Sequence, residues 1–181
     1  MKYLTERNIE GESTCIYFLL SNKINPEFWG HILSKIDNED LHSNGKEFEP
    51  HVTVCYSPEA NKKPRVREIF KFFRSCLPTE ITFQEFDIFQ NDEYDVLFMK
   101  AFKTTRLEKI KNKTLSIFGM ESLHPEYVPH MTIAYLKSGE GEYYRNILNE
   151  LIEFPKMVEV DSMVYSVSGY EKSYKLVYRK N

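Results

Sequence analysis

The feature that most constrains the fold is a seven-residue pattern that occurs twice. The first copy, PHVTVCY, spans residues 50–56, and the second, PHMTIAY, spans residues 129–135. Proline, histidine, threonine and tyrosine recur at the same offsets, and apolar residues follow the histidine and the threonine. Proline suits the first position of a strand because it cannot donate to a ladder. The repeat therefore predicts two equivalent β-strands.

Alternation of side chains predicts which residues of these strands lie together. Successive side chains of a strand point to opposite faces. His51 and Thr53 therefore share one face of the first strand, and His130 and Thr132 share the corresponding face of the second. The intervening apolar residues form a face that can be buried. Two such strands side by side would bring two imidazoles and two hydroxyls to one site.

These residue types suit in-line displacement at a phosphodiester. Histidine has an unperturbed pKa of about 6.5, so one imidazole can accept a proton while the other donates one. Threonine hydroxyls can donate hydrogen bonds to phosphate oxygens. Each His-x-Thr strand offers a single ring nitrogen, and no carboxylate or thiolate recurs with it at ligand spacing, so neither a metal site nor a cofactor is expected.

With two His-x-Thr strands whose histidines are at positions 51 and 130, the chain resembles the 2H phosphoesterase superfamily, which includes RNA ligase-like proteins and cyclic phosphodiesterases. Shorter stretches resemble the phage enzymes that destroy cyclic oligonucleotide signals of bacterial CBASS immunity. These stretches are Cys15–Leu20, Tyr56-Ser57 and Pro125–His130. The resemblance implies two lobes with the motifs lining the cleft between them, and cyclic di- or trinucleotides as substrates.

The hydrophobic periodicity predicts an α+β fold. Strands are expected at 13–20, 80–90, 94–102, 157–167 and 170–178, besides the motif strands at 50–56 and 128–136. Helices are expected from Pro26 and over 65–77, 105–118 and 139–152, and a polar connection over 37–49. This order contains itself twice, which indicates two lobes, and no linker separates them, so we expect one domain over residues 1–181. Its two pseudo-symmetric lobes would be antiparallel sheets flanked by helices, with the active-site cleft between them.

Composition limits the class of partner. The net charge is −3, whereas broad nucleic-acid binding relies on a basic surface. We therefore expect a small nucleotide in a local pocket and no stable large nucleic-acid partner. Three cysteines without ligand-like spacing indicate reduced thiols of a cytosolic protein. The chain lacks a signal-like apolar segment and any membrane-spanning apolar run, so a cytoplasmic location is expected, in the host if the source is a phage.

Three further residues are candidates for contacts with the substrate. Tyr17, near the centre of the first strand, is placed to stack on a base, although a buried core tyrosine is an equally good interpretation. His124 precedes the second motif, and Lys137 follows it, where it would either steer a phosphate or lie on a solvated surface. Counting by two from each histidine places Tyr56 and Tyr135 on the apolar face, so these two are predicted to pack in the core.

The motifs thus predict a metal-independent phosphodiesterase, and the resemblance to the phage enzymes implies that it cleaves the 3′–5′ bonds of cyclic di- or trinucleotides and so counteracts CBASS defence. His51 and His130, in an order that the sequence leaves open, would deprotonate the nucleophile and protonate the leaving oxygen, and Thr53 and Thr132 would hold the non-bridging oxygens. One alternative is a 2H enzyme of RNA metabolism that acts on 2′,3′-cyclic phosphates or 2′–5′ linkages. Another is a module that sequesters a nucleotide without cleaving it.

Overall fold

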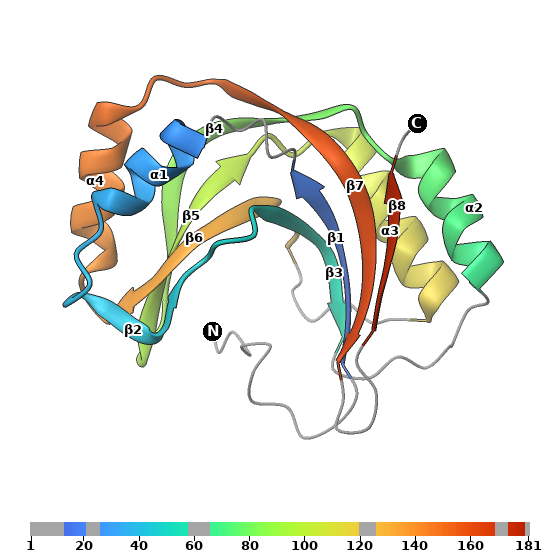
Figure 1. The fold of residues 1–181 in the computed structure, drawn as a ribbon, viewed down its shortest axis with the longest axis horizontal. Coiled ribbons are helices and arrows are strands. Elements are labelled where there is room, and N and C mark those ends of the chain that lie inside the picture. The colour runs from blue at the N-terminus through green and yellow to red at the C-terminus, as the bar shows by residue number, and fades with distance from the viewer. Residues whose placement is uncertain (1–12, 21–25, 58–65, 120–125, 169–173, 180–181) are drawn as a thin grey trace.

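The chain folds into a strongly curved antiparallel sheet, an arch with helices on its outer side (Figure 1). The computed structural model describes residues 13–20, 26–57, 66–119, 126–168 and 174–179. Within them the strands are β1 (Ser13–Leu20), β2 (Leu41–Lys46), β3 (His51–Ser57), β4 (Glu80–Gln90), β5 (Tyr94–Ala101), β6 (His130–Lys137), β7 (Lys156–Ser168) and β8 (Tyr174–Arg179). The helices are α1 (Pro26–Ser34), α2 (Val66–Cys76), α3 (Thr105–Phe118) and α4 (Gly141–Leu151).

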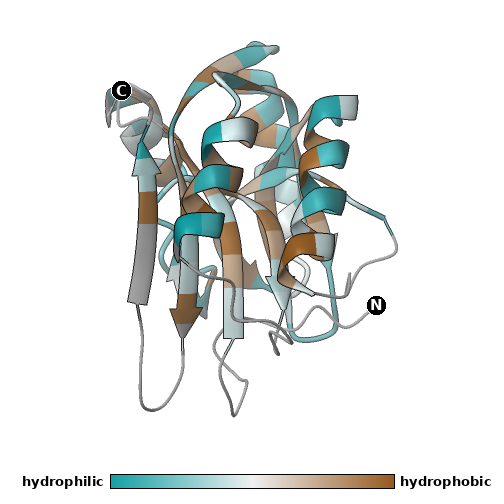
Figure 2. Cartoon of the chain, turned by 90° about the vertical axis from the view of Figure 1, so that its right-hand side faces the viewer, coloured by the Kyte–Doolittle hydropathy of each residue, from teal (hydrophilic) through white to brown (hydrophobic). Residues whose placement is uncertain are grey.

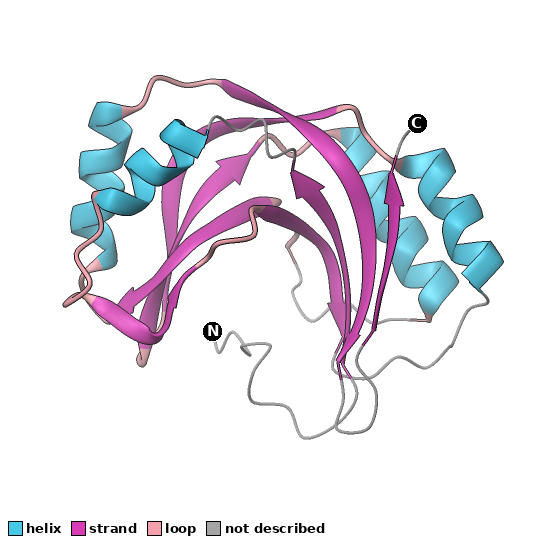
Figure 3. Cartoon of the chain, in the orientation of Figure 1, coloured by secondary structure: helices cyan, strands magenta, loops and turns pink. Residues whose placement is uncertain are grey.

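The two lobes are halves of one continuous sheet. Its strand order is β2-β6-β5-β4-β7-β1-β3, and β8 pairs with β7. β7 joins the halves, because residues 156–159 pair with β4 and residues 160–168 pair with β1. Figure 3 shows α1 and α4 outside one half of the arch and α2 and α3 outside the other. The predicted α+β class with helix-flanked antiparallel strands is confirmed, and among the described residues no helix covers the inner, concave face of the sheet.

The core lies between the sheet and the helices. On β1, Ile16 and Phe18 are fully buried. Phe118 of α3 stacks on Tyr165 of β7 with ring centroids 5.4 Å apart, and meets Phe72 of α2 at 6.1 Å. Figure 2 shows hydrophilic and hydrophobic bands alternating along the helices, as expected where one helical face packs on a sheet and the other meets solvent. Apolar burial therefore determines which face of the sheet packs against the helices.

The predicted ends of α3 are confirmed by its caps. The Thr104 side chain accepts a hydrogen bond from the Leu107 N–H at 3.2 Å, which satisfies one unpaired donor at the start of the helix. Gly119 ends the helix in the left-handed region, with a φ of 63°. In the described part of the chain, none of the helices combines the length and the apolar character that a bilayer crossing requires.

The structure differs from the prediction between residues 37 and 49. The sequence there predicts only a polar connection, but Leu41–Lys46 form β2, which pairs with β6. Its polar side chains and a glycine give no alternating pattern. This strand therefore forms because its backbone pairs with the otherwise unpaired edge of β6. The Lys46 ammonium anchors it, since it donates to the carbonyl oxygens of Leu33 and Ile36 at 2.9 and 2.8 Å, at the end of α1.

Two helical glycines provide a matched pair of stability tests. A Cβ at Gly141, the first residue of α4, would lie 2.8 Å from the Asp95 Cβ and 2.9 Å from its Oδ2. Asp95 is buried and accepts hydrogen bonds from the N–H groups of Gly139 and Gly141, so it cannot move without losing them. We expect Gly141→Ala to lower the free energy of unfolding by about 1–3 kcal/mol.

The control is Gly30, on the exposed side of α1, where an added Cβ meets nothing within 4 Å. There Gly30→Ala is expected to raise the free energy of unfolding by about 0.5–1 kcal/mol, because alanine loses less backbone entropy in a helix. Urea unfolding followed by circular dichroism measures both changes. Shifts of the same sign in the two variants would contradict the packing argument.

Candidate active site

The two motif strands meet where the lobes join. β3 and β6 begin beside each other at the crown of the arch and diverge down its two legs (Figure 1). The Glu47 N–H donates to the Ile133 carbonyl at 2.8 Å, and the Tyr127 hydroxyl donates to the Thr53 carbonyl at 3.4 Å. Glu47 precedes β3 and Tyr127 precedes β6. The segment that leads into each motif strand therefore contacts the other motif strand.

The histidines and threonines of both motifs lie on the concave face. His51, Thr53, His130 and Thr132 are each half-buried. The residues that follow each of them are only 0–2 % exposed and belong to the core under the helices. The predicted alternation along the first part of each strand is thus confirmed, and it turns all four polar side chains away from the helices, toward the concave face.

Each imidazole is held by the backbone just before its own strand. Nδ1 of His51 lies 2.7 Å from the Glu49 carbonyl oxygen, and Nδ1 of His130 lies 2.8 Å from the Val128 carbonyl oxygen. A carbonyl oxygen only accepts, so Nδ1 donates in both cases and Nε2 is the ring atom that can exchange a proton. This equivalent geometry allows either histidine to act as the acid or as the base.

Each imidazole also lies against an aromatic ring of the neighbouring strand. Tyr17 of β1 is opposite Thr53, and its ring centroid is 4.9 Å from the imidazole of that motif. Phe98 of β5 is opposite Thr132, with its centroid 5.0 Å from the imidazole of the second motif. The strands next to the two motif strands, β1 and β5, are thus related by the same approximate two-fold symmetry as the motif strands. Tyr17 is only 6 % exposed, so its ring packs within the protein instead of offering a broad face to a base.

The tyrosine of the first motif lies on the concave face, so its predicted position in the core is wrong. Thr53 and Cys55 oppose successive residues of β1, which leaves Val54 as an extra residue, a β-bulge. One extra residue shifts the alternation of faces by one. Tyr56 therefore returns to the face of Thr53, where it is half-buried.

The second motif contains the same irregularity at the same offset. Thr132 and Ala134 oppose successive residues of β5, which leaves Ile133 as the extra residue. Tyr135 therefore also faces the concave side, and its ring centroid lies 5.9 Å from that of Tyr94. The prediction fails in both strands for one physical reason: register is a property of the strand pair, and counting along a single strand does not reveal it.

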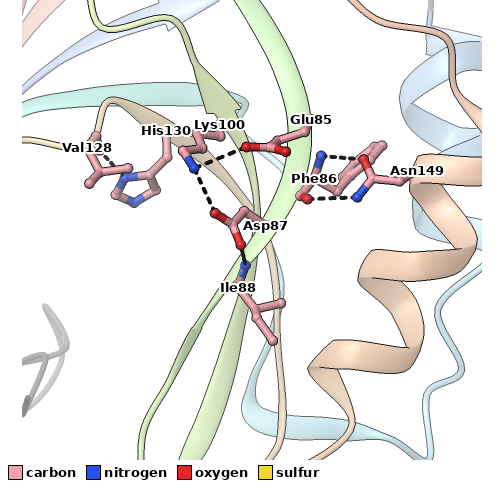
Figure 4. A network of polar contacts seen from close by, with 8 residues as sticks. All are labelled: Glu85, Phe86, Asp87, Ile88, Lys100, Val128, His130 and Asn149. Atoms are coloured by element: carbon pink, nitrogen blue, oxygen red, sulfur yellow. Dashed lines mark hydrogen bonds and ion pairs between the residues drawn. The ribbon is translucent and has the colours of Figure 1, made fainter.

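The surroundings of the two histidines differ in charge. Lys100 of β5 is directly opposite His130. Its ammonium contacts the carboxylates of Glu85 at 3.0 Å and Asp87 at 3.1 Å, both on β4. Figure 4 shows this cluster beside His130. Hydrogen bonds to the two carboxylates raise the pKa of Lys100 above its ordinary value, so the cluster is a stable cation between two carboxylates.

The equivalent positions of the other lobe carry no charge. The residue opposite His51 on β1 is Leu19, and the residue opposite Leu19 on β7 is Ser162. An apolar and a small polar residue thus stand where Lys100 and Glu85 stand beside the other histidine. This difference gives two geometrically equivalent imidazoles different electrostatic surroundings.

Comparison with known proteins decides the family. A family model described as the 2′-5′ RNA ligase superfamily matches residues 26–165, a span that includes both motifs. The chain belongs to this superfamily. Its two His-x-Thr strands are those of a 2H phosphoesterase, and the protein is accordingly a phosphodiesterase. Comparison with curated protein sequences gives no match.

Solved structures share the fold of this superfamily member at low sequence identity. Usb1 of Kluyveromyces marxianus is 9 % identical, with a TM-score of 0.57 over 93 % of this chain and 99 % of that one. Its structure with uridine monophosphate is 10 % identical, with a TM-score of 0.54 over the same shares. Escherichia coli LigT complexed with NADP+ is 15 % identical, with a TM-score of 0.52 over 95 % of this chain and 96 % of that one.

The structure does not bring the other predicted substrate-binding residues together beside the motif histidines. Lys137 is exposed at the far end of β6, about 20 Å along the strand from His130. His124 lies outside the described residues. Sequence reasoning also missed several side chains near the motifs, among them the two motif tyrosines, Phe98 beside His130 and the Lys100 cluster.

The described residues show no metal cluster, and the Cys55 thiol is held protonated by its burial. Within them, no group of three or more His, Cys, Asp or Glu side chains has the arrangement of a metal site. None of the three cysteines forms a disulfide. Burial raises the pKa of the Cys55 thiol to about 11, so this side chain serves packing rather than nucleophilic chemistry.

Replacing Lys100 with methionine tests what the charged cluster contributes. The variant leaves Glu85 and Asp87 near His130 without the ammonium between them, and the carboxylates then repel an anionic substrate. We expect KM for a dinucleotide to rise about fivefold, the equivalent of roughly 1 kcal/mol for one charge in a hydrated site. The increase should shrink as ionic strength rises.

The control for this variant is Lys103→Met, which breaks a comparably exposed ion pair with Glu108 at the start of α3. Its KM should equal that of the unmodified protein. Steady-state kinetics at low and high salt separates the two variants. A loss in Lys100→Met that is confined to kcat and insensitive to salt would contradict the electrostatic account.

Proposed function

We propose that the protein is a metal-independent phosphodiesterase that cleaves short nucleotides, with the cyclic di- and trinucleotides of bacterial immune signalling as its substrates. His51 and His130 act as base and acid, and Thr53 and Thr132 bind the non-bridging oxygens. The observation that carries this proposal is the meeting of β3 and β6 at the crown. The burial of the alternating apolar residues leaves both His-x-Thr faces on the concave side.

The proposed reaction removes one proton from the attacking oxygen and delivers one proton to the leaving oxygen. Nε2 of one imidazole removes the proton from the nucleophile, either water or a ribose 2′-hydroxyl, as that oxygen attacks phosphorus. The bond from phosphorus to the leaving oxygen breaks, and Nε2 of the other, protonated imidazole gives its proton to that oxygen. The threonine hydroxyls donate to the oxygens on which negative charge develops. No step requires a redox partner.

Three kinds of observation support a short substrate whose cleavage would counteract CBASS defence. The net charge of −3 and the carboxylates of Glu85 and Asp87 on the concave face disfavour a long polyanion. The stretches Cys15–Leu20 and Pro125–His130 resemble the phage enzymes that act on cyclic oligonucleotides. A protein of the same fold, Usb1, has been solved with a single nucleotide, uridine monophosphate.

The second candidate is a 2H enzyme of RNA metabolism. It is favoured by the description of the matching family as the 2′-5′ RNA ligase superfamily and by the fold shared with LigT and Usb1. Its substrates would be 2′,3′-cyclic phosphates or 2′–5′ linkages. A module that only sequesters a nucleotide is disfavoured, because binding alone has no need of two matched imidazoles.

A substrate panel separates these functions. The purified protein is incubated in excess EDTA with cyclic dinucleotides, cyclic trinucleotides, 2′–5′ oligoadenylate and a 2′,3′-cyclic mononucleotide, and the products are resolved by chromatography and mass. Cleavage of the cyclic oligonucleotides supports the proposed function. Cleavage confined to the other two substrates would move the protein into RNA metabolism. Binding without cleavage of any substrate would overturn the enzymatic proposal in favour of sequestration.

A further inference from the structure

Two β-bulges at equivalent positions point to a role for the motif tyrosines. A bulge disrupts the ladder locally and leaves one residue unpaired, and bulges are common where a side chain is re-aimed beside an active site. Here the extra residues, Val54 and Ile133, occur at the same offset after the threonine in both motifs. Without them Tyr56 and Tyr135 would point under the helices. The same irregularity thus moves the same residue type to the concave face twice.

The divergence of the two motif strands separates these tyrosines. β3 and β6 begin side by side and run down opposite legs of the arch (Figure 1). A strand rises about 3.3 Å per residue, so each tyrosine lies about 7 Å beyond its threonine once the bulged residue is discounted. If the threonines hold the scissile phosphate, Tyr56 and Tyr135 lie on either side of it. The distance from each tyrosine to its threonine is comparable to that between a phosphate and its nucleoside.

The immediate surroundings leave each ring positioned rather than mobile. Tyr56 is opposite Cys15 of β1, and Tyr135 is opposite Val96 of β5 and contacts the ring of Tyr94. Both tyrosines are half-buried. The Tyr56 hydroxyl oxygen is buried, so only part of its ring can meet a ligand. A ring that is already held by its neighbours loses little conformational entropy when a base stacks on it.

Resting on the proposed function, we propose that Tyr56 and Tyr135 are a matched pair of substrate-positioning residues, each of which takes one of the two nucleosides that flank an internal phosphodiester. Stacking on an aromatic ring tolerates any base, because every base has a π face. The pair therefore selects substrates with a nucleoside on both sides of the scissile phosphate. A 2′,3′-cyclic mononucleotide, which has only one nucleoside, can engage only one of the two rings.

Kinetics of single variants tests the pair. Tyr56→Ala and Tyr135→Ala are each expected to raise KM for a dinucleotide about 5- to 150-fold, the equivalent of the roughly 1–3 kcal/mol of stacking per base. The pH profile of kcat should stay unchanged, and Tyr56→Phe and Tyr135→Phe should restore KM, since phenylalanine keeps the ring. With 2′,3′-cyclic AMP, only one of the alanine variants should raise KM.

Direct binding separates this inference from the proposed function. The affinity of the same dinucleotide is measured by calorimetry in a His51→Ala/His130→Ala background, which needs no turnover. Weaker binding in both tyrosine variants supports the pair even if no substrate is cleaved. Tyr143→Ala, at an exposed position of α4, is the control and should bind normally. Unchanged affinity in either tyrosine variant, or failure of phenylalanine to restore it, would overturn the inference.

Discussion

Alanine at either His51 or His130 is expected to lower kcat for phosphodiester cleavage by about 10²- to 10⁴-fold. Positioned proton transfer supplies a factor of this size, and each imidazole has its own part in the proposed displacement. Because the two groups act in one step, the double variant should be little slower than the slower single variant. Both side chains are half-buried on the concave face, so the melting temperature should hardly change. Single-turnover kinetics and thermal unfolding provide the two measurements.

The pH dependence gives the same test a second readout. A base that must be neutral and an acid that must be protonated produce a bell-shaped profile of kcat/KM. Each single variant should lose one limb of that bell, and the limb lost identifies the role of the missing imidazole. The matched control is His31→Ala on the exposed side of α1, which should keep full activity. Near-full activity in either motif variant would disprove two-histidine chemistry in this protein.

Much of the fold could be predicted because its strands and helices are locally encoded. The motif strands, the hairpin of β4 and β5, and the caps of α3 at Thr104 and Gly119 follow from alternation, turn residues and capping chemistry. The two-fold repeat also predicted that His51 and His130 would share a face with their threonines. These features depend on residues close in sequence, so the sequence alone carries the signal.

What could not be predicted depends on pairing between distant strands. The bulges at Val54 and Ile133 arise from the register with β1 and β5, and the apolar residues there look like ordinary strand interior. β2 likewise exists because β6 offers it an edge. The charged cluster did leave a signal: once the turn at Asn91-Asp92 fixes the hairpin register, Glu85 and Lys100 fall opposite each other.

Loss of the ring at Phe98 is expected to damage both stability and catalysis. Phe98 is 1 % exposed, stacks on Phe89 with centroids 4.1 Å apart, and lies 5.0 Å from the imidazole of His130. Phe98→Ala should lower the free energy of unfolding by about 3–5 kcal/mol through the lost burial and the cavity left behind. It should also lower kcat about 100-fold, because an imidazole that is misplaced by about 1 Å loses that much.

The neighbouring residue separates these two effects. Leu97 is fully buried on the opposite, helix-covered face of the same strand, so Leu97→Ala should cost about 2–5 kcal/mol of stability while leaving the surroundings of His130 intact. Urea unfolding measures both losses, and kcat is compared at a temperature where both variants remain folded. If Phe98→Ala unfolds, Phe98→Leu, which retains most of the apolar volume, replaces it in the comparison of kcat. Equal losses of kcat at positions 97 and 98 would show that general loosening of the sheet, rather than support of the His130 ring, limits the reaction.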